Sequence, residues 1–211
     1  MDLTNSQRIR KLLRAHLSQP RWILPWLRDN FLARRSPIEM ARPWFSYAAT
    51  EWLASHLRPT MRVFEYGSGG STLFFSSRVA AVVSVEDDAA WHSIVATRIA
   101  ELGRSNVEVR HRAFDFIRPR DFAASEYVAE IRNGAPWDII VVDGQDWTFQ
   151  ERPVCFAEAE KCVASGGIIV VDDSWRYRQL RDSPRAREDR VFESVGPGRI
   201  GVSSTDVYFY A

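Results

Sequence analysis

Carboxylates follow the most apolar runs of this chain, at the points where those runs end. These acids are Glu86, Asp87 and Asp88 after residues 81–85, Asp143 after residues 137–142, and Asp172 and Asp173 after residues 168–171. The run at 137–142 is nearly all apolar, as expected of a central parallel strand covered on both faces. The carboxyl ends of such strands meet at one edge of the sheet, where ligands bind. Acids placed there could bind hydroxyls, accept a proton or hold a cation.

A glycine-rich turn precedes all of these acids. The chain reads Val63-Phe64-Glu65-Tyr66-Gly67-Ser68-Gly69-Gly70-Ser71-Thr72, with three glycines in four positions. The pattern predicts a strand that ends near Phe64, a tight turn, and a helix capped by Ser71 or Thr72. The start of such a helix presents free N–H groups to a ligand. The alternative is an ordinary turn whose glycines serve only the backbone.

Glu86 lies about 20 residues beyond the first glycine of the turn, the interval at which dinucleotide-type folds place a carboxylate on ribose hydroxyls. Glu86 is therefore the predicted ribose ligand, which leaves Asp87 and Asp88 as caps of the helix that starts near Ala89. In the alternative interpretation, all three acids, Glu86 included, serve only to complement the dipole of that helix.

Hydrophobic periodicity predicts the elements that would position these residues. We expect helices over residues 6–17, 43–57, 91–102, 121–131 and 153–164, and strands over residues 63–64, 81–85, 107–111, 137–142, 165–171, 191–195 and 205–210. Cys155 and Cys162 are about two turns apart on the last of these helices, too far to form a disulfide. They are expected to be reduced core residues.

Four blocks of the chain, in their order and spacing, resemble the class I S-adenosylmethionine-dependent methyltransferases. They are Glu65-Tyr66-Gly67-Ser68-Gly69, Glu86, residues 137–144 and residues 165–173. The acid two residues before Gly67 and the Gly-Gly pair before the fifth strand distinguish this pattern from that of nicotinamide-binding folds. The resemblance implies an α/β, Rossmann-like fold: a seven-stranded, mostly parallel sheet with helices on both faces and an antiparallel last strand. It also implies S-adenosylmethionine as cofactor and methyl transfer as the reaction.

The same resemblance implies a set of cofactor-binding residues: Glu65, Gly67, Ser68, Gly69, Ser71, Glu86, Asp87, Ala113 and Asp143. Ala113 follows the third strand, where the family meets the adenine, and Asp115 is the weaker candidate there. Trp44 and Tyr47 precede the first strand and could help to line the site, although aromatic residues at helical spacing more often belong to the core.

Asp143, Asp172 and Asp173 also resemble the acids of metal-dependent O-methyltransferases that act on sugars or catechols. Three adjacent carboxylates would repel one another, and Mg²⁺ suits such oxygen ligands. Mg²⁺ would lower the pKa of a substrate hydroxyl, and Asp146 or Asp173 would take the proton. The lysine that often follows the fourth-strand acid in catechol-type enzymes is missing, because Gly144-Gln145-Asp146 stands there. Without a metal, Asp143 would bind the cofactor or backbone, Asp172 and Asp173 would cap loops, and a carboxylate would be the general base.

Residues 1–42 form a predicted basic helical extension ahead of a methyltransferase domain at residues 43–211. The extension holds nine Lys and Arg against three acids, net +6, which leaves 28 − 9 = 19 bases and 27 − 3 = 24 acids, net −5, in the remainder. A basic segment with tryptophans could contact a membrane surface. We favour the alternative that it covers the sheet edge, forms a lid or packs on a second subunit of a homodimer, because its prolines break a long apolar face. No run is long enough to span a membrane and the polar start is no signal peptide, so we expect a cytoplasmic protein.

A basic run follows the fifth strand. It contains Arg176, Arg178, Arg181, Arg185, Arg187 and Arg190. These arginines either form a solvated face or contact an anionic substrate such as a phosphate or uronate. The predicted acceptor is a hydroxyl of a small molecule or glycan. A nucleic-acid or protein methyltransferase is one alternative, although no nucleic-acid module or Asn-Pro-Pro-Tyr type motif is present. A noncatalytic cofactor-binding protein is the other.

Overall fold

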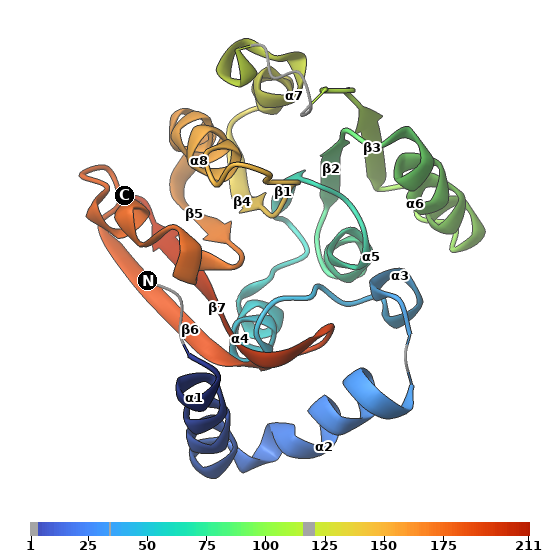
Figure 1. Ribbon diagram of the computed structural model, residues 1–211. Coiled ribbons are helices and arrows are strands. Elements are labelled where there is room, and N and C mark those ends of the chain that lie inside the picture. The colour runs from blue at the N-terminus through green and yellow to red at the C-terminus, as the bar shows by residue number, and fades with distance from the viewer. Residues whose placement is uncertain (1–3, 34, 116–120) are drawn as a thin grey trace.

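The computed structural model describes residues 4–33, 35–115 and 121–211. Residues 1–3 and Arg34, which belong to the predicted extension, lie outside the described residues. The strands form a seven-stranded sheet in the order β3-β2-β1-β4-β5-β7-β6 (Figure 1). Their bounds are β1 Arg62–Tyr66, β2 Ala81–Glu86, β3 Val107–His111, β4 Trp137–Val142, β5 Val163–Val171, β6 Glu188–Gly196 and β7 Arg199–Phe209.

The sheet is parallel from β3 to β5, and β7 then runs antiparallel to both β5 and β6. The predicted fold class, with its antiparallel last strand, is therefore confirmed. Tyr66 at the end of β1 pairs with Val85 and Val142, and Val142 pairs with Val171. Because these strands end level with one another, the glycine turn and the acids that follow β2, β4 and β5 reach the same edge of the sheet.

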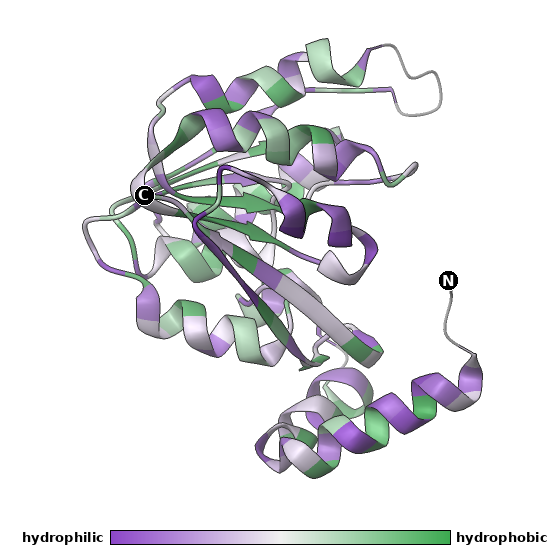
Figure 2. Ribbon diagram, turned by 90° about the vertical axis from the view of Figure 1, so that its left-hand side faces the viewer, coloured by the Kyte–Doolittle hydropathy of each residue, from purple (hydrophilic) through white to green (hydrophobic). Residues whose placement is uncertain are grey.

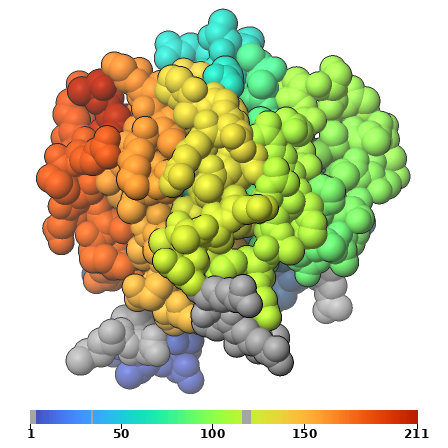
Figure 3. Space-filling model, turned by 90° about the horizontal axis from the view of Figure 1, so that it is seen from above, coloured from blue at the N-terminus to red at the C-terminus, as the bar shows by residue number. Residues whose placement is uncertain are grey.

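Helices cover both faces of the sheet, since alternate residues of its strands point in opposite directions. On one face Phe64 packs with Phe156 of α8 (Glu151–Cys162) and with residues of α7 (Glu126–Ala129). On the other face Val63 packs with Phe75 of α5 (Gly70–Ser76) and with α4 (Tyr47–His56). Helix α6 (Ala89–Glu101) contacts β2 and β3 beside α5. Seen from above in Figure 3, the orange segment around α8, the yellow segment before it and the green segment that includes α6 and β3 lie side by side across the surface.

Two local predictions were wrong. Helix α5 begins at Gly70, and its cap is Gly69 rather than Ser71 or Thr72. Thr72 instead reaches back, and its Oγ1 accepts a hydrogen bond from Gly69 N at 3.0 Å. The helix expected at 121–131 is broken into η3 (Phe122–Ala124), α7 and η4 (Glu130–Arg132), because Ser125 starts a new turn by accepting a hydrogen bond from Val128 N.

The remaining short turns follow β5. They are η5 (Ser174–Arg176) and η6 (Arg178–Asp182), and they lead into β6. Around the predicted turn at Gly196-Pro197-Gly198, β6 starts three residues earlier than expected and β7 starts six residues earlier than expected. Both cysteines are buried and free, as predicted.

The N-terminal extension packs against the β6–β7 hairpin. It comprises α1 (Asn5–Ser18), η1 (Pro20–Trp22), α2 (Ile23–Leu27), a π-helical turn η2 (Arg28–Leu32) and α3 (Pro37–Met40). Trp22 and Trp26 form a buried cluster with Tyr47 and Val195, and Trp26 Nε1 donates to the carbonyl oxygen of Arg199 at 3.1 Å. Figure 2 shows α1 and the next turns beyond the lower end of the sheet.

The outer surface of this extension carries exposed apolar residues, among them Ile9, Leu13, Leu17, Leu24 and Leu32. None of the helices in the described residues combines the length and apolar character needed to cross a membrane. Contact with a membrane surface and a homodimer both stay predictions.

Candidate functional site

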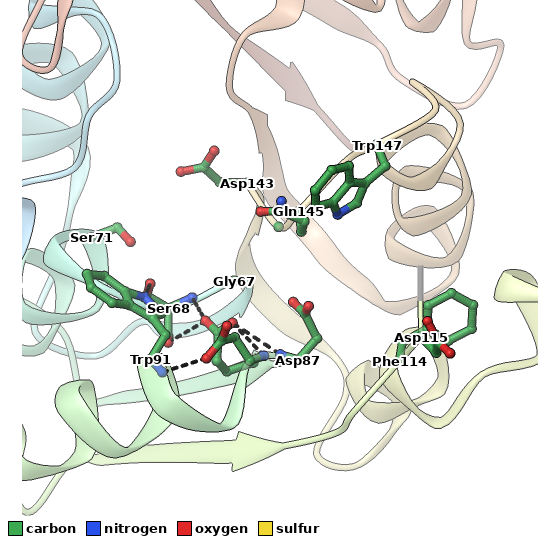
Figure 4. Close-up of a pocket in the computed structure, with 13 residues that line it drawn as sticks. Gly67, Ser68, Ser71, Asp87, Trp91, Phe114, Asp115, Asp143, Gln145 and Trp147 are labelled. Atoms are coloured by element: carbon green, nitrogen blue, oxygen red, sulfur yellow. Dashed lines mark hydrogen bonds between the residues drawn. The ribbon is translucent and has the colours of Figure 1, made fainter. Parts of the chain in front are cut away.

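A cavity of about 580 Å³ lies at the carboxyl ends of β1, β2 and β4. It is lined by Gly67, Ser68, Ser71, Glu86, Asp87, Asp88, Trp91, Phe114, Asp115, Asp143, Gly144, Gln145 and Trp147 (Figure 4). Five of these side chains are carboxylates, and among the described residues that line the cavity none is Lys, Arg or His. The cavity, which we call the acidic cavity, therefore favours a ligand with positive charge.

The glycine turn forms the floor of the acidic cavity. Gly67 has φ +89°, and a Cβ at this position would lie 3.0 Å from Gly144 Cα and 3.1 Å from the Asp143 carbonyl oxygen. Only glycine allows both this backbone conformation and this close approach of the turn to the end of β4. Gly70 is packed more tightly still: its Cβ would meet the carbonyl oxygens of Arg42 at 2.2 Å and Pro37 at 2.3 Å. The segment around α3 thus lies directly on the start of α5.

Glu86, at the end of β2, forms hydrogen bonds with the glycine turn. Its Oε2 accepts hydrogen bonds from Ser68 N at 3.0 Å and Ser68 Oγ at 2.7 Å, and its Oε1 accepts from the backbone N–H groups of Asp87 and Asp88. The carboxylate lines the acidic cavity, as a ribose ligand should. Asp88 is the N-cap of α6, since its Oδ1 accepts from Trp91 N at 2.8 Å, so its predicted capping role is confirmed.

Asp87 points into the acidic cavity in Figure 4. Burial, together with the neighbouring charge of Glu86, raises the pKa of Asp87 to about 6. Trp91, which the sequence pattern placed only as a helix residue, also borders the cavity: its Nε1 donates to the Ser68 carbonyl oxygen at 2.8 Å, and its ring lies 3.6 Å from the Cβ position of Gly69.

Glu65 lies behind the glycine turn rather than in the cavity lining. It is 1% exposed, and its Oε2 accepts from Ser84 Oγ at 2.7 Å. Its Oε1 has no hydrogen bond of good geometry within the described part of the chain. Burial raises the pKa of Glu65 to about 7, although the hydroxyls of Ser84, Thr72 and Ser71 lower it. A buried carboxyl with an unsatisfied oxygen beside Ser71, which does line the cavity, is a feature that a cationic ligand would complete.

Asp143 stands between the acidic cavity and a second cavity of about 790 Å³, and it lines both. Arg152 of α8 holds this carboxylate: its Nη2 lies 3.0 Å from Asp143 Oδ1, while its Nη1 donates to the Asp172 carbonyl oxygen at 2.8 Å and its Nε to the Gly144 carbonyl oxygen at 3.0 Å. Burial raises the pKa of Asp143 to about 6 even though Arg152 lowers it.

The predicted Mg²⁺ site at Asp143, Asp172 and Asp173 is not supported. The described residues contain no group of three or more His, Cys, Asp or Glu side chains placed to hold a metal ion. Each carboxylate is directed to another partner: Asp143 to Arg152, Asp172 Oδ1 to Thr205 Oγ1 at 2.6 Å, and Asp173 to Arg199 Nη2 at 2.9 Å and Ser203 Oγ at 3.1 Å. The residues in this arrangement do not fit a metal ion, because guanidinium groups compensate the charge of Asp143 and Asp173, and a hydroxyl group binds Asp172.

Of the other predicted residues, some line a cavity and some do not. Asp146, a candidate base, lines neither cavity, and its Oδ2 accepts from Tyr177 OH at 2.5 Å. Ala113 is likewise absent from both linings, whereas Phe114 and Asp115 border the acidic cavity. Trp44 lines the second cavity, but the Tyr47 hydroxyl is buried against Asp29 at 2.8 Å.

The basic run after β5 does not reach either cavity. Arg181 pairs with the buried Asp206 at 2.7 Å, and Arg190 pairs with Glu188 on β6 at 2.7 Å. None of the six arginines from Arg176 to Arg190 is among the described residues that line a cavity. The second cavity instead takes its arginines from the extension, from α8 and from the β6–β7 turn, which no local sequence signal marked.

Comparisons with known proteins agree with this geometry. No family model and no curated protein matches the chain, but many solved structures do. An O-methyltransferase from Bacillus cereus in complex with SAH has a TM-score of 0.62 and 17% identity over 89% of this chain and 96% of that one. Cofactor-bound Rv0187 from MTB has a TM-score of 0.61 and 16% identity over 99% of each chain.

The neighbours are not limited to one class of substrate. An rRNA methylase from Streptococcus thermophilus has a TM-score of 0.54 and 13% identity over 83% of this chain and 96% of that one. At sequence identities of 13–17%, the similarity shows only a shared fold, and all three of these structures have it. The chain therefore has the fold of the class I S-adenosylmethionine-dependent methyltransferases.

Proposed function

We propose that the protein is an S-adenosylmethionine-dependent methyltransferase that acts on a hydroxyl of a small molecule or glycan, with Asp143 as general base. The observation that carries this proposal is the composition of the acidic cavity: five carboxylates and no basic side chain among its described lining residues, above a glycine turn at the strand ends. Nicotinamide and flavin dinucleotides carry phosphates, which such a cavity would repel. S-adenosylmethionine carries a sulfonium and an ammonium group, and the acidic cavity would attract both.

The residues of the acidic cavity suit the parts of this cofactor. Glu86 would bind the ribose hydroxyls, and Ser71, backed by the unsatisfied Glu65 carboxyl, would face the ammonium group. Phe114 and Asp115 would border the adenine, at the position after the third strand that the family resemblance indicates. When bound, the cofactor supplies an electrophilic methyl group on sulfur.

Asp143 is suited to remove the proton of an acceptor hydroxyl. Asp143 lines both cavities, so the hydroxyl oxygen of an acceptor in the second cavity could contact Asp143 and still face a cofactor in the acidic cavity. With a pKa of about 6, its carboxylate is ionised at neutral pH and still basic enough to accept a proton. Arg152 is a positioning residue, because its contacts to Asp143, Gly144 and Asp172 fix the carboxylate at the junction.

Titration calorimetry with S-adenosylmethionine and with SAH tests the proposal first. We expect binding to wild-type protein, none to Gly67→Arg, and no binding of NAD⁺. Parallel titrations with Mg²⁺ and with EDTA show whether cofactor binding depends on a metal. Failure of the wild type to bind either compound would overturn the proposal. Binding without SAH formation in a broad screen of hydroxyl acceptors would favour a noncatalytic protein.

A further inference from the structure

The second cavity, which we call the arginine cavity, differs in charge from the acidic one. It is lined by arginines, aspartates and Trp44, together with residues of the glycine turn and of the turn between β6 and β7. Four of these side chains are arginines and three are aspartates. The two cavities share Ser68, Ser71, Trp91 and Asp143, so a molecule in the arginine cavity would lie next to one in the acidic cavity.

Two of the four arginines are already committed to aspartates. Arg152 is held by Asp143 and by two carbonyl oxygens, and Arg199 lies 2.9 Å from Asp173. The third aspartate, Asp172, is buried, and burial together with the two neighbouring carboxylates raises its pKa well above the usual value. The three aspartates of this lining therefore do not form ion pairs with the other two arginines.

These two arginines, Arg35 and Arg42, stand on either side of α3. The carboxylate paired with Arg42 is Asp29, at the long distance of 4.0 Å. Asp29 already accepts hydrogen bonds from Arg28 Nε and Tyr47 OH, both at 2.8 Å. Half of the Arg42 side chain is exposed at the cavity. A guanidinium has five N–H donors in a planar fork, so Arg42 retains the capacity for a bidentate contact to a carboxylate or phosphate.

Trp44 provides an apolar wall beside these charges. It is 44% exposed, and its ring lies over Gly198 of the hairpin turn, where a Cβ would come within 2.7 Å of Trp44 Cδ2. The close contact with Gly198 fixes the ring at the rim of the cavity. A planar or sugar-like body could pack on this surface while its charged group meets an arginine.

We propose that the methyl acceptor is a small anionic molecule whose phosphate or carboxylate group is bound by Arg42 and Arg35. Its body packs on Trp44, and its hydroxyl reaches Asp143. This inference rests on the proposed function and names its substrate class. It also replaces the expectation that the basic run at Arg176–Arg190 contacts an anionic substrate, since those side chains lie outside both linings.

Calorimetry on the SAH-saturated protein tests the inference with four probes: inorganic phosphate, glucose 6-phosphate, glucuronate and glucose. We expect at least one charged sugar to bind and glucose to bind at least tenfold more weakly. Arg42→Gln should weaken binding of the charged probe about tenfold to a hundredfold, as for the loss of charge-assisted hydrogen bonds. The affinity of Arg42→Lys for the charged probe should lie between those of the wild type and Arg42→Gln, since lysine keeps the positive charge but lacks the planar set of donors of a guanidinium group.

The matched control is Arg21→Gln. Arg21 belongs to the same extension and is exposed, but it pairs with Glu51 at 3.0 Å and lines neither cavity. This variant should bind the charged probe as the wild type does. A preference for glucose 6-phosphate over glucuronate, or the reverse, would support the inference and identify the anion.

Three results with these sugar and phosphate probes would overturn the inference. They are binding of none of the charged probes, equal affinity for glucose and its charged analogues, and unchanged affinity in Arg42→Gln. Binding of single-stranded RNA alone, with a steep salt dependence, would also overturn it and favour a nucleic-acid acceptor. SAH binding is measured in the same samples: if it persists, only the inference fails, and if it is lacking in the wild type, the proposed function fails as well.

Discussion

The acidic and arginine cavities share four residues yet have opposite characters. The acidic cavity is lined by five carboxylates and, within the described lining, no base, whereas the arginine cavity has four arginines against three aspartates. Asp143 belongs to both. The contrast agrees with the two proposals above, in which a cationic ligand binds on one side, an anionic ligand binds on the other, and one carboxylate lies between their reacting groups.

The cavities also differ in how the chain builds them. The acidic cavity comes from residues at or just after strand ends and from the start of α6, all within a continuous α/β core. The arginine cavity adds the segment around α3 and the turn between β6 and β7, which are far apart in sequence. Under the proposed function, the cofactor side would therefore be encoded locally, while the acceptor side would exist only after the extension has packed on the hairpin.

Asp143→Asn should produce the largest effect, because it removes the base shared by the two cavities. We expect methyl transfer to an acceptor found by screening to fall by about 10²–10⁴-fold, the usual contribution of general base catalysis. SAH affinity, measured by calorimetry, should change by less than about threefold, since the acidic cavity keeps its other carboxylates. An equal loss of affinity and rate would show instead that Asp143 mainly binds the cofactor.

Glu86→Gln should act on the acidic cavity alone. Loss of the charged hydrogen-bond acceptor should weaken SAH binding by about 10- to 100-fold, while the affinity for an anionic probe in the arginine cavity stays unchanged. Glu108→Gln is the control, since Glu108 is exposed on the neighbouring β3 and pairs with Arg110 at 2.8 Å. A similar loss in both variants would point to a general effect of negative charge rather than to a specific contact.

The pH dependence of the rate should follow the raised pKa of Asp143. The carboxylate is the active form, so activity is present above a pH of about 6 and is lost as the pH falls through this value. From pH 7 to pH 5 the rate should fall about tenfold at saturating cofactor, which separates Asp143 from the titration of Asp87. The residual rate of Asp143→Asn should not vary over this pH range. If the rate of this variant fell with pH as steeply as the rate of the wild type, Asp143 would be excluded as the titrating base.

Gly70→Ala should have a smaller effect, on stability and on the arginine cavity. The new methyl group would meet the carbonyl oxygens of Arg42 and Pro37 and displace the segment around α3. We expect a loss of about 1–3 kcal/mol in the free energy of unfolding, measured by urea denaturation. Gly201→Ala is the control, because a Cβ there has no neighbour within 4 Å and the change should be within about 0.5 kcal/mol. Equal stability of the two variants would contradict the tight contact.

The sheet could be predicted from the sequence because its signals are local. Buried parallel strands appear as short apolar runs, and those at 81–85, 107–111 and 137–142 differ from β2, β3 and β4 by no more than one residue at either end. The glycine turn was located correctly as well, because its backbone conformation requires glycine at Gly67. For the same reason Glu86 could be placed at the edge of the sheet beside the turn.

The partners of the acidic side chains could not be predicted. Whether Asp143 faces a metal ion or a guanidinium depends on where α8 carries Arg152, nine positions further on and across a loop. The roles of Arg42 and Trp44 depend on the hairpin turn more than 150 residues away in sequence. Such contacts form only when the tertiary structure forms, so the hydrophobic periodicity of the sequence cannot predict them.

The position of Gly70 beneath the carbonyl oxygens of Pro37 and Arg42 has a consequence for the evolution of this chain. A side chain at residue 70 and the present path of residues 37–42 exclude one another. Homologues in which residues 37–42 follow the same path should therefore keep glycine at position 70. Homologues that have lost this glycine should have a different backbone path in the segment that corresponds to residues 37–42. Covariation between residue 70 and the segment ahead of α4 would then divide the relatives into groups with different acceptors, even where their cofactor-binding residues are identical.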